Sequence, residues 1–149
     1  MNYSLRPATT ALHFSDIIIL DRACFPEDEV IQPEKGVYWL LWADGKPIGY
    51  TGVRDAPYDE PGAVAIRTRS CVLRGHRGKG LQRRLIRVSQ RWARSAGLKT
   101  LLATTACWNS PSINNFIRTG WRAYQPAHPW MENSTIYWRW ATTWPMRAW

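Results

Sequence analysis

Acidic residues are missing from the middle of this sequence. From Pro61 to Met131 there is no aspartate or glutamate, against thirteen lysines and arginines. Residues 1–60 hold ten acidic and five basic side chains, so the net charge of +9 arises beyond residue 60. A basic half without acids favours an anionic ligand or partner on that side of the protein, although a solvated basic face has the same pattern.

Long apolar runs are missing as well. The run of residues 17–20 is too short to cross a bilayer, and no apolar stretch of the signal-peptide kind follows residues 1–10. We therefore expect no membrane partner. A chain of 149 residues with 45% hydrophobic residues is long enough to bury one core, which predicts a single domain over residues 1–149.

Cysteine is scarce in this chain. Cys24, Cys71 and Cys107 are odd in number and widely spaced, and this pattern predicts neither a metal site nor a disulfide framework. We interpret Cys71 and Cys107 as buried strand residues. Because chains without disulfides are typical of reducing compartments, the sequence predicts a cytoplasmic protein.

Hydrophobic periodicity predicts the element order β-α-β-β-β-α-β-α-β-β, which is an α/β fold with a largely antiparallel sheet. Asp44-Gly45 predicts a tight hairpin turn between two of the strands. The expected strands cover residues 3–6, 37–42, 46–54, 63–73, 100–107, 121–124 and 135–141. The expected helices cover residues 10–23, 81–96 and 110–119, the last with Asn109 or Ser110 as its N-cap.

Apolar spacing predicts which side chains are buried. The helix over residues 81–96 is expected to bury a face formed by Leu81, Leu85, Val88, Trp92 and Ala96. Ten tryptophans suggest platforms for stacked bases, but Trp121, Trp138 and Trp140 stand at core-like positions. We therefore interpret the tryptophans mainly as core residues.

Residues 74–85, RGHRGKGLQRRL, join a strand to a helix and combine three glycines with several basic side chains. A nucleotide P-loop is excluded because Leu81-Gln82 stands where Lys-Ser/Thr is required, and the dinucleotide fingerprint fails at Arg83. Glycines allow close approach to the main chain, and the helix N-terminus attracts anions. A diphosphate cradle is therefore favoured over an arginine- and glycine-rich patch for nucleic acid, with full charges from Arg77, Lys79 and Arg83.

Two motifs resemble the GNAT-type N-acetyltransferase superfamily. Its central motif, [Q/R]-x-x-G-x-[G/A], is similar to Arg77-Gly78-Lys79-Gly80-Leu81 after a strand that ends near Val72. Gln82 departs from the glycine or alanine usual at the next position, but its N–H can still donate. The downstream motif N-x-x-[S/A]-x-x-x-[Y/F]-x-x-x-G-[F/W] is matched by Asn109, Ser112, Phe116, Gly120 and Trp121. Residues 20–26, LDRACFP, also resemble the start of the substrate loop in ribosomal-protein N-terminal acetyltransferases.

This resemblance implies a GNAT fold, with a central, mostly antiparallel twisted sheet of six to seven strands flanked by about four helices. It implies acetyl-CoA as the cosubstrate and no metal ion. The main-chain amides of residues 77–83 would hold the pyrophosphate, residues 71–73 would pair with the pantetheine arm, and a main-chain N–H near Val72 would polarise the acyl carbonyl. The implied acetyl-CoA residues are Cys71, Val72, Leu73, Arg77, Gly78, Lys79, Gly80, Leu81, Gln82, Arg83, Asn109, Ser112 and Phe116.

The resemblance also implies that an amine attacks the thioester directly, without an acyl-enzyme. Many relatives carry a tyrosine at the place of Phe116, where it protonates the departing thiolate. Phenylalanine has no proton to give, which leaves three alternatives. Ser112 or water could protonate the thiolate instead, or the thiolate could leave unprotonated because the ordinary pKa of a thiol is only about 8.5. In the third, the protein is slow or binds acyl-CoA without transferring the acyl group. The strand over residues 63–73 has no acidic residue that could take a proton from the amine. The candidate general bases therefore lie elsewhere: Asp55, Asp59, Glu60 and residues 27–29. Ser112, Asp55 and Glu60 are the catalytic candidates.

The acidic N-terminal half favours a cationic acceptor, such as a protein N-terminus, a lysine or a small-molecule amine. The basic half leaves room for a nucleic acid partner, such as an aminoacyl-tRNA or modified DNA, beyond the charges that CoA would neutralise. A non-catalytic acyl-CoA-binding relative is the third alternative. We expect a monomer or a homodimer.

Overall fold

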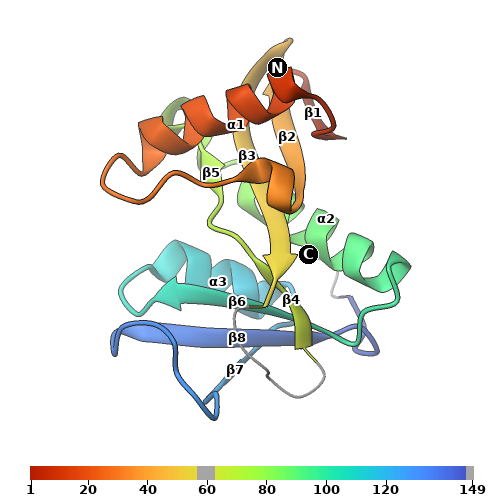
Figure 1. Ribbon diagram of the computed structural model, residues 1–149, viewed down its shortest axis with the longest axis vertical. Coiled ribbons are helices and arrows are strands. Elements are labelled where there is room, and N and C mark those ends of the chain that lie inside the picture. Colours follow the sequence, from red (N-terminus) through yellow and green to blue (C-terminus); the bar gives the residue numbers. More distant parts are fainter. Residues whose placement is uncertain (57–62, 147–149) are drawn as a thin grey trace. The chain divides into compact units, whose positions relative to one another are not determined.

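The computed structural model describes residues 1–56 and 63–146. Within these residues, eight strands and three α-helices follow one another along the chain, with two short 3₁₀ helices, η1 and η2 (Figure 1). The α/β class expected from the sequence is confirmed. The strand count exceeds six to seven because the strand expected over residues 63–73 is divided in two, and there are three α-helices where about four were expected. The elements are β1 (Tyr3–Pro7), α1 (Ala11–Cys24), η1 (Pro33–Lys35), β2 (Val37–Ala43), β3 (Lys46–Asp55), β4 (Ala63–Arg67), β5 (Cys71–Val72), η2 (Arg74–His76), α2 (Leu81–Ser95), β6 (Thr100–Ala106), α3 (Ser110–Arg118), β7 (Arg122–Tyr124) and β8 (Thr135–Ala141).

The chain divides into two compact units. The first consists of Met1–Arg54 and Thr68–Leu85, and the second of Asp55–Arg67 and Ile86–Trp149. Because each unit is built from two separate segments, neither corresponds to a simple N- or C-terminal half. A single domain over residues 1–149 stays a prediction. None of the helices within the described residues is long and apolar enough to cross a membrane.

The first unit contains an antiparallel arrangement of β1, β2 and β3, with the short β5 paired to β3. The turn between β2 and β3 has Asp44 at φ 48° and Gly45 at φ 83°. Positive φ at both central residues is what a two-residue hairpin turn of type I′ requires, so the tight turn predicted from Asp44-Gly45 is confirmed.

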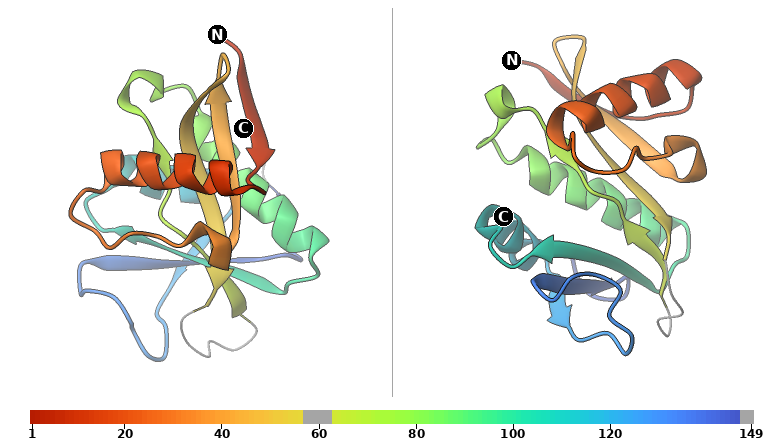
Figure 2. Two further views of the ribbon diagram at one scale, coloured as in Figure 1. Left: turned by 45° about the horizontal axis from the view of Figure 1, so that its top comes forward. Right: turned by 60° about the vertical axis from the view of Figure 1, so that its left-hand side comes forward.

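The core of the first unit has two faces. Helix α1 lies across one face of β2 and β3, as the views in Figure 2 show, and its buried Ile17 and Leu20 pack in one cluster with Tyr38, Leu40 and Tyr50. On the other face, Leu41 and its neighbours pack against the first turns of α2 in a cluster of Leu41, Ala43, Ile48, Leu81 and Leu85. The alternation of β2 side chains between these clusters follows from the two-residue period of a strand.

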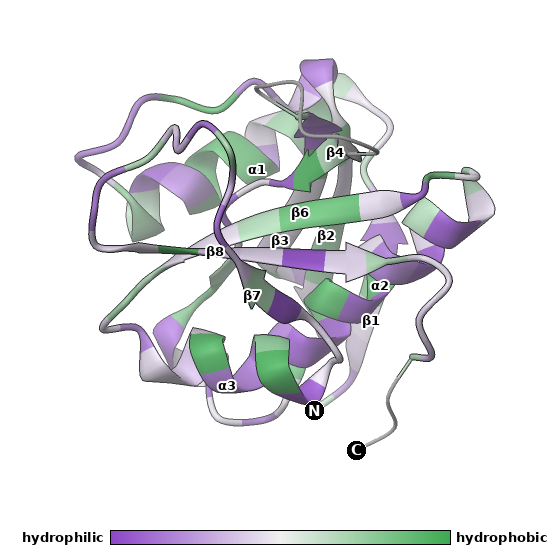
Figure 3. Cartoon of the chain, turned by 90° about the horizontal axis from the view of Figure 1, so that it is seen from below, coloured by the Kyte–Doolittle hydropathy of each residue, from purple (hydrophilic) through white to green (hydrophobic). Residues whose placement is uncertain are grey.

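The second unit is built around β6, whose hydrophobic residues stand out in Figure 3. Strand β4 pairs with β6 in parallel, whereas β8 pairs antiparallel with both β6 and β7. Trp121, Trp138 and Trp140 are buried, and Arg139 between the last two is exposed. The interpretation of these tryptophans as core residues is therefore confirmed.

The buried face of α2 differs from the expected one. Leu81 and Leu85 are buried as predicted, but Val88 and Trp92 are only partly buried and Ala96 is exposed. The face is rotated because two polar side chains are buried with partners: Gln90 Nε2 donates to Thr119 O at 2.9 Å, and Ser89 Oγ donates to Ile86 O at 2.6 Å. The fully or nearly fully buried residues of α2 are Leu81, Leu85, Ile86, Ser89, Gln90 and Ala93.

The cysteine predictions need two corrections. Cys24 and Cys71 form a disulfide across a sequence separation of 47 residues, because the end of α1 packs against β5 and brings their Cα atoms to 6.5 Å. Cys71 is buried in a strand as expected, but Cys107 is exposed in the turn after β6. A cytoplasmic location was inferred partly from the lack of disulfides and stays a prediction.

Candidate functional site

The glycine-rich loop runs from η2 into α2 and lies in the first unit. Gly78 has φ 79° and Gly80 has φ 75°, in the left-handed region that glycine enters most easily. A Cβ at Gly78 would meet nothing within 4 Å, whereas one at Gly80 would approach Arg83 Nη2 to 3.1 Å. The main chain at Gly78 is therefore bare on the side where a side chain would stand.

Side chains of the loop fasten it to two strands of the same unit. Arg77 Nε donates to Val72 O of β5 at 2.8 Å. Lys79 Nζ donates to the hydroxyl of Tyr3 in β1 at 3.2 Å, and the same hydroxyl lies 3.0 Å from His76 Nδ1. The loop conformation thus depends on specific contacts with β1 and β5, which hold two cationic side chains at the loop.

The N-terminus of α2 supplies the donors for an anion. Arg84 N donates to Gly80 O at 3.3 Å, and the amides of residues 81–83 lie in the first turn before it, where a helix directs its N–H groups toward the helix end. The first turn contains no acidic residue. Together with the helix dipole and the charges of Arg77, Lys79 and Arg83, this geometry fits the pyrophosphate of a nucleotide-like cosubstrate.

Strand β5 presents an edge that suits an extended ligand. Among the strand pairs of the described residues β5 has one partner, β3, with Val72 opposite Gly49. Leu73 N donates to Ile48 O at 2.9 Å, and since donors alternate along a strand, the N–H of Val72 points away from β3. An amide-containing arm fits the Val72 N–H on this edge, beside the Val72 carbonyl that accepts from Arg77 Nε. Gly49 permits the close pairing, because a Cβ there would lie 2.5 Å from Cys71 O.

The second predicted motif lies in the second unit. Asn109 is the N-cap of α3, where its Oδ1 accepts from Ser112 N at 3.3 Å, so the capping prediction is confirmed. Ser112 is buried and Asn109 is exposed. The ring of Phe116 is 2% exposed, stacks on Trp138 with centroids 5.6 Å apart and meets Trp121 edge-on at 5.0 Å. Phe116 is therefore a packing residue, and contacts of these three residues with acetyl-CoA stay predictions.

The candidate bases come from different segments of the chain. Asp55 is exposed at the end of β3, and the acidic residues 27–29 are exposed after α1. Asp59 and Glu60 lie outside the described residues. No group of three or more His, Cys, Asp or Glu side chains in residues 1–56 and 63–146 is arranged to hold a metal ion.

A buried arginine in the second unit was not anticipated. Arg67 of β4 is 7% exposed, its Nε donates to Ser89 Oγ at 3.0 Å, and its guanidinium lies 5.5 Å from the centre of the Phe116 ring. Burial lowers the pKa of the guanidinium to about 9. Side-chain alternation along a strand does not tell which face is covered, so the sequence alone does not single out Arg67 as buried.

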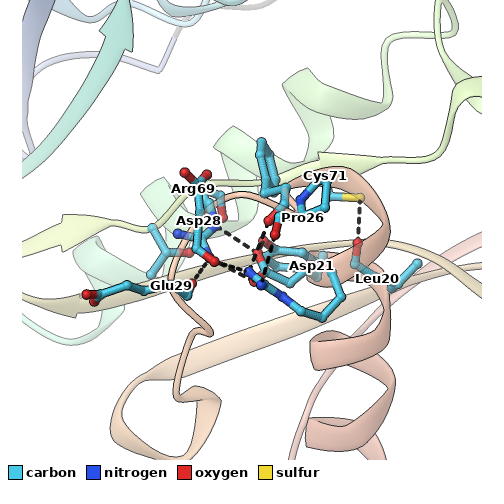
Figure 4. A network of polar contacts seen from close by, with 11 residues as sticks. Leu20, Asp21, Pro26, Asp28, Glu29, Arg69 and Cys71 are labelled. Carbon is cyan, nitrogen blue, oxygen red and sulfur yellow. Dashed lines mark hydrogen bonds and ion pairs between the residues drawn. The ribbon is translucent and has the colours of Figure 1, made fainter.

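A buried carboxylate in the first unit was also missed (Figure 4). Asp21 of α1 is 0% exposed, and its two carboxylate oxygens accept hydrogen bonds from Nε and Nη2 of Arg69, both at 2.8 Å. The hydroxyl of Tyr50 donates a further hydrogen bond to the same carboxylate. The signal was present: Asp21 stands one turn after Ile17 on the apolar stripe of its helix, where an acid requires a partner.

Comparison with known proteins decides the family. The model of the acetyltransferase (GNAT) family matches residues 8–121, which include both predicted motifs. The chain belongs to the GNAT acetyltransferase family. No curated protein sequence matches this GNAT chain significantly.

Solved structures agree with the fold of this GNAT protein. The ribosomal-protein-S18-alanine N-acetyltransferase of Escherichia coli is 14% identical, with 97% of this chain and 96% of that chain covered and a TM-score of 0.71. The NAA60 protein of Arabidopsis thaliana, solved in complex with acetyl-CoA, is 15% identical over 94% and 98% of the chains, with a TM-score of 0.73. The ribosomal-protein-alanine N-acetyltransferase of Brucella melitensis is 14% identical over 93% and 99%, with a TM-score of 0.72. At such identities the likeness shows the fold, and the GNAT fold expected from the sequence is confirmed.

Proposed function

We propose that this protein is an N-acetyltransferase that moves an acetyl group from acetyl-CoA to a primary amine. The amine is that of a protein N-terminus, a lysine or a small molecule. One observation carries the proposal: the bare glycine loop at the N-terminus of α2 adjoins β5, a strand that pairs with β3 alone among the strands of the described residues. The loop offers main-chain amides and positive charge to a diphosphate. The adjoining strand β5 offers main-chain pairing to an amide-containing thioester arm. Acetyl-CoA carries both groups in one molecule.

The residues of the chain divide the work as follows. The amides of residues 77–83 bind the pyrophosphate, and the edge of residues 71–73 aligns the arm. The N–H of Val72 polarises the thioester carbonyl, as donors aimed at a developing oxyanion do. The amine attacks the carbonyl carbon, a C–N bond forms, the C–S bond breaks and the thiolate departs. Asp55 and Glu60 stay candidates for accepting the ammonium proton, and Ser112 stays a candidate for donating one to the thiolate.

A nucleic-acid-linked acceptor is the second candidate, and one observation favours it. Helix α2 carries Arg84, Arg91 and Arg94 as exposed residues on the side opposite its buried face, with no acid beside them in the helix. Such a stripe attracts phosphates, and binding through it would weaken steeply with salt. The burial of Trp121, Trp138 and Trp140 removes these rings as base-stacking platforms.

The test is calorimetric titration with CoA, alongside release of free CoA thiol with a panel of amines. Gly78→Glu and Gly80→Glu are expected to abolish CoA binding, because each places a negative side chain in a loop at positive φ. Gly45→Glu is the matched control, since Gly45 also has positive φ and open space in the first unit but lies in the β2–β3 hairpin. Unchanged CoA affinity in both loop variants would refute the proposal.

A further inference from the structure

The segment after α1 is held by arginine side chains rather than by regular secondary structure. We call residues 25–29 the acidic segment, because it contains Glu27, Asp28 and Glu29, all exposed. Its main chain forms turns without strand pairing. Arginine is suited to order such a segment, since one guanidinium carries five donors in a fixed plane.

Arg22 supplies the first set of contacts. Its side chain, at the end of α1, is 33% exposed. Nη2 of Arg22 donates to a carboxylate oxygen of Asp21 at 3.4 Å. The main-chain carbonyls that accept hydrogen bonds from Arg22 are those of Phe25 at 3.0 Å, Pro26 at 3.4 Å and Asp28.

Arg69 supplies the second set, from the stretch between β4 and β5. It is bound to Asp21 by two hydrogen bonds, and its Nη2 also donates to the carbonyl of Glu29. A two-pronged arginine–carboxylate pair fixes the guanidinium in both position and plane. Figure 4 shows Arg69 beside Asp21 and Glu29. The pair with Asp21 thus fixes Arg69 where it meets the end of the acidic segment.

The acidic segment is also placed beside β5. The Cys24–Cys71 disulfide joins the residue before the segment to the first residue of β5, and Cys71 Sγ lies 3.9 Å from Leu20 O. Strand β5 is the one whose edge would present the thioester arm. An ordered chain segment next to that strand limits which amines can approach the acyl group, and from which direction.

We propose that Asp21 is a positioning residue for acetyl transfer, which holds Arg22 and Arg69 so that together they order the acidic segment beside β5 and thereby set the acceptor's access. The inference rests on the proposed acetyltransferase function. It assigns no contact between Asp21 and either substrate, because Asp21 is fully buried.

The test uses Asp21→Asn, which keeps the shape of the side chain but removes its charge, and Arg69→Lys, which keeps the charge but loses the paired hydrogen bonds. Arg6→Lys is the matched control, since Arg6 is an exposed arginine of β1. In both test variants, amide hydrogen exchange at Asp28, whose N–H donates to Phe25 O at 3.2 Å within the acidic segment, is expected to rise about tenfold. Such a rise corresponds to the loss of one charge-assisted hydrogen bond, and exchange in residues 77–83 is expected to stay unchanged. The KM for the amine is expected to rise about tenfold while the KM for acetyl-CoA stays constant.

Two results would overturn the inference: unchanged amide exchange at Asp28, or an equal rise of both KM values. If Asp21 had a merely structural role, its loss would raise amide exchange in residues 77–83 and in the acidic segment together. A rise in the acidic segment alone therefore indicates the positioning role. If Asp21→Asn does not fold, Arg69→Lys gives the same decision. If the wild-type protein acetylates no amine, the proposed function fails by itself, and the exchange data still confirm or refute the ordering role of Asp21.

Discussion

Cys24 at the end of α1 and Cys71 at the start of β5 are joined by a disulfide, although 47 residues separate them in the sequence. The bond connects the helix that precedes the acidic segment to the strand that precedes the glycine loop. In the proposed reaction the acidic segment would face the amine, and β5 with the glycine loop would hold acetyl-CoA. The disulfide therefore links these two parts of the first unit covalently.

This bond predicts a redox-dependent stability. Cys24→Ser and Cys71→Ser are each expected to lower the free energy of unfolding by about 2–4 kcal/mol, because the cross-link restricts the unfolded chain. Urea denaturation with and without a thiol reductant measures the effect, and intact mass reports the two hydrogens gained on reduction. Cys107→Ser is the control, since Cys107 is exposed and outside the pair. Equal stability of oxidised and reduced wild-type protein would contradict the prediction.

Gly49 allows a second prediction, about the pairing of β3 with β5. A Cβ at this position would lie 2.5 Å from Cys71 O, a main-chain atom that cannot move alone. Gly49→Ala is therefore expected to cost about 1–3 kcal/mol of stability through local overpacking and to weaken CoA binding, because β5 must shift. Gly75→Ala is the matched control, with open space around its Cβ. CoA titration of both variants checks the prediction, and equal affinities would refute it.

Phe116 supports a third prediction, about packing in the second unit. Its ring lies between Trp138 and Trp121 and is 2% exposed. Phe116→Ala should cost about 3–5 kcal/mol in the free energy of unfolding, since it leaves a cavity between two aromatic rings. Ile117→Ala, at the next position of the same helix but 49% exposed, should change it by less than about 0.5 kcal/mol. Similar losses in the two variants would show that the ring is not a core residue.

Local signals in the sequence predicted the local features of this protein. The N-cap at Asn109, the turn at Asp44-Gly45 and the start of α2 after the glycine loop depend on neighbouring residues, and all three are present. The GNAT family could be predicted for the same reason, because each of its two motifs is a short stretch of neighbouring residues.

The features that were missed depend on partners far away in the sequence. The strand predicted over residues 63–73 breaks at residues 68–70, where Thr68 N bonds Gly52 O and Ser70 Oγ meets Thr51 Oγ1 at 2.8 Å. Between these two, Arg69 turns to Asp21, 48 residues away. Side-chain alternation in this stretch is compatible with one unbroken strand, so periodicity could not reveal the break.

The buried carboxylate of Asp21 leads to a final prediction, about how the free energy of unfolding depends on pH. Burial raises the pKa of the Asp21 carboxyl, but hydrogen bonds from Arg69, Tyr50 and Arg22, with the charge of Arg69, bring it below 3.8 overall. Since the folded-state pKa lies below the unfolded one, the carboxylate stabilises the fold fully at neutral pH, and this contribution is lost as the pH falls through the folded-state value. Urea denaturation should therefore show the largest stability difference between wild type and Asp21→Asn at neutral pH and a shrinking one below about pH 4. A difference that stays constant on acidification would mean that the charge of Asp21 does not stabilise the fold.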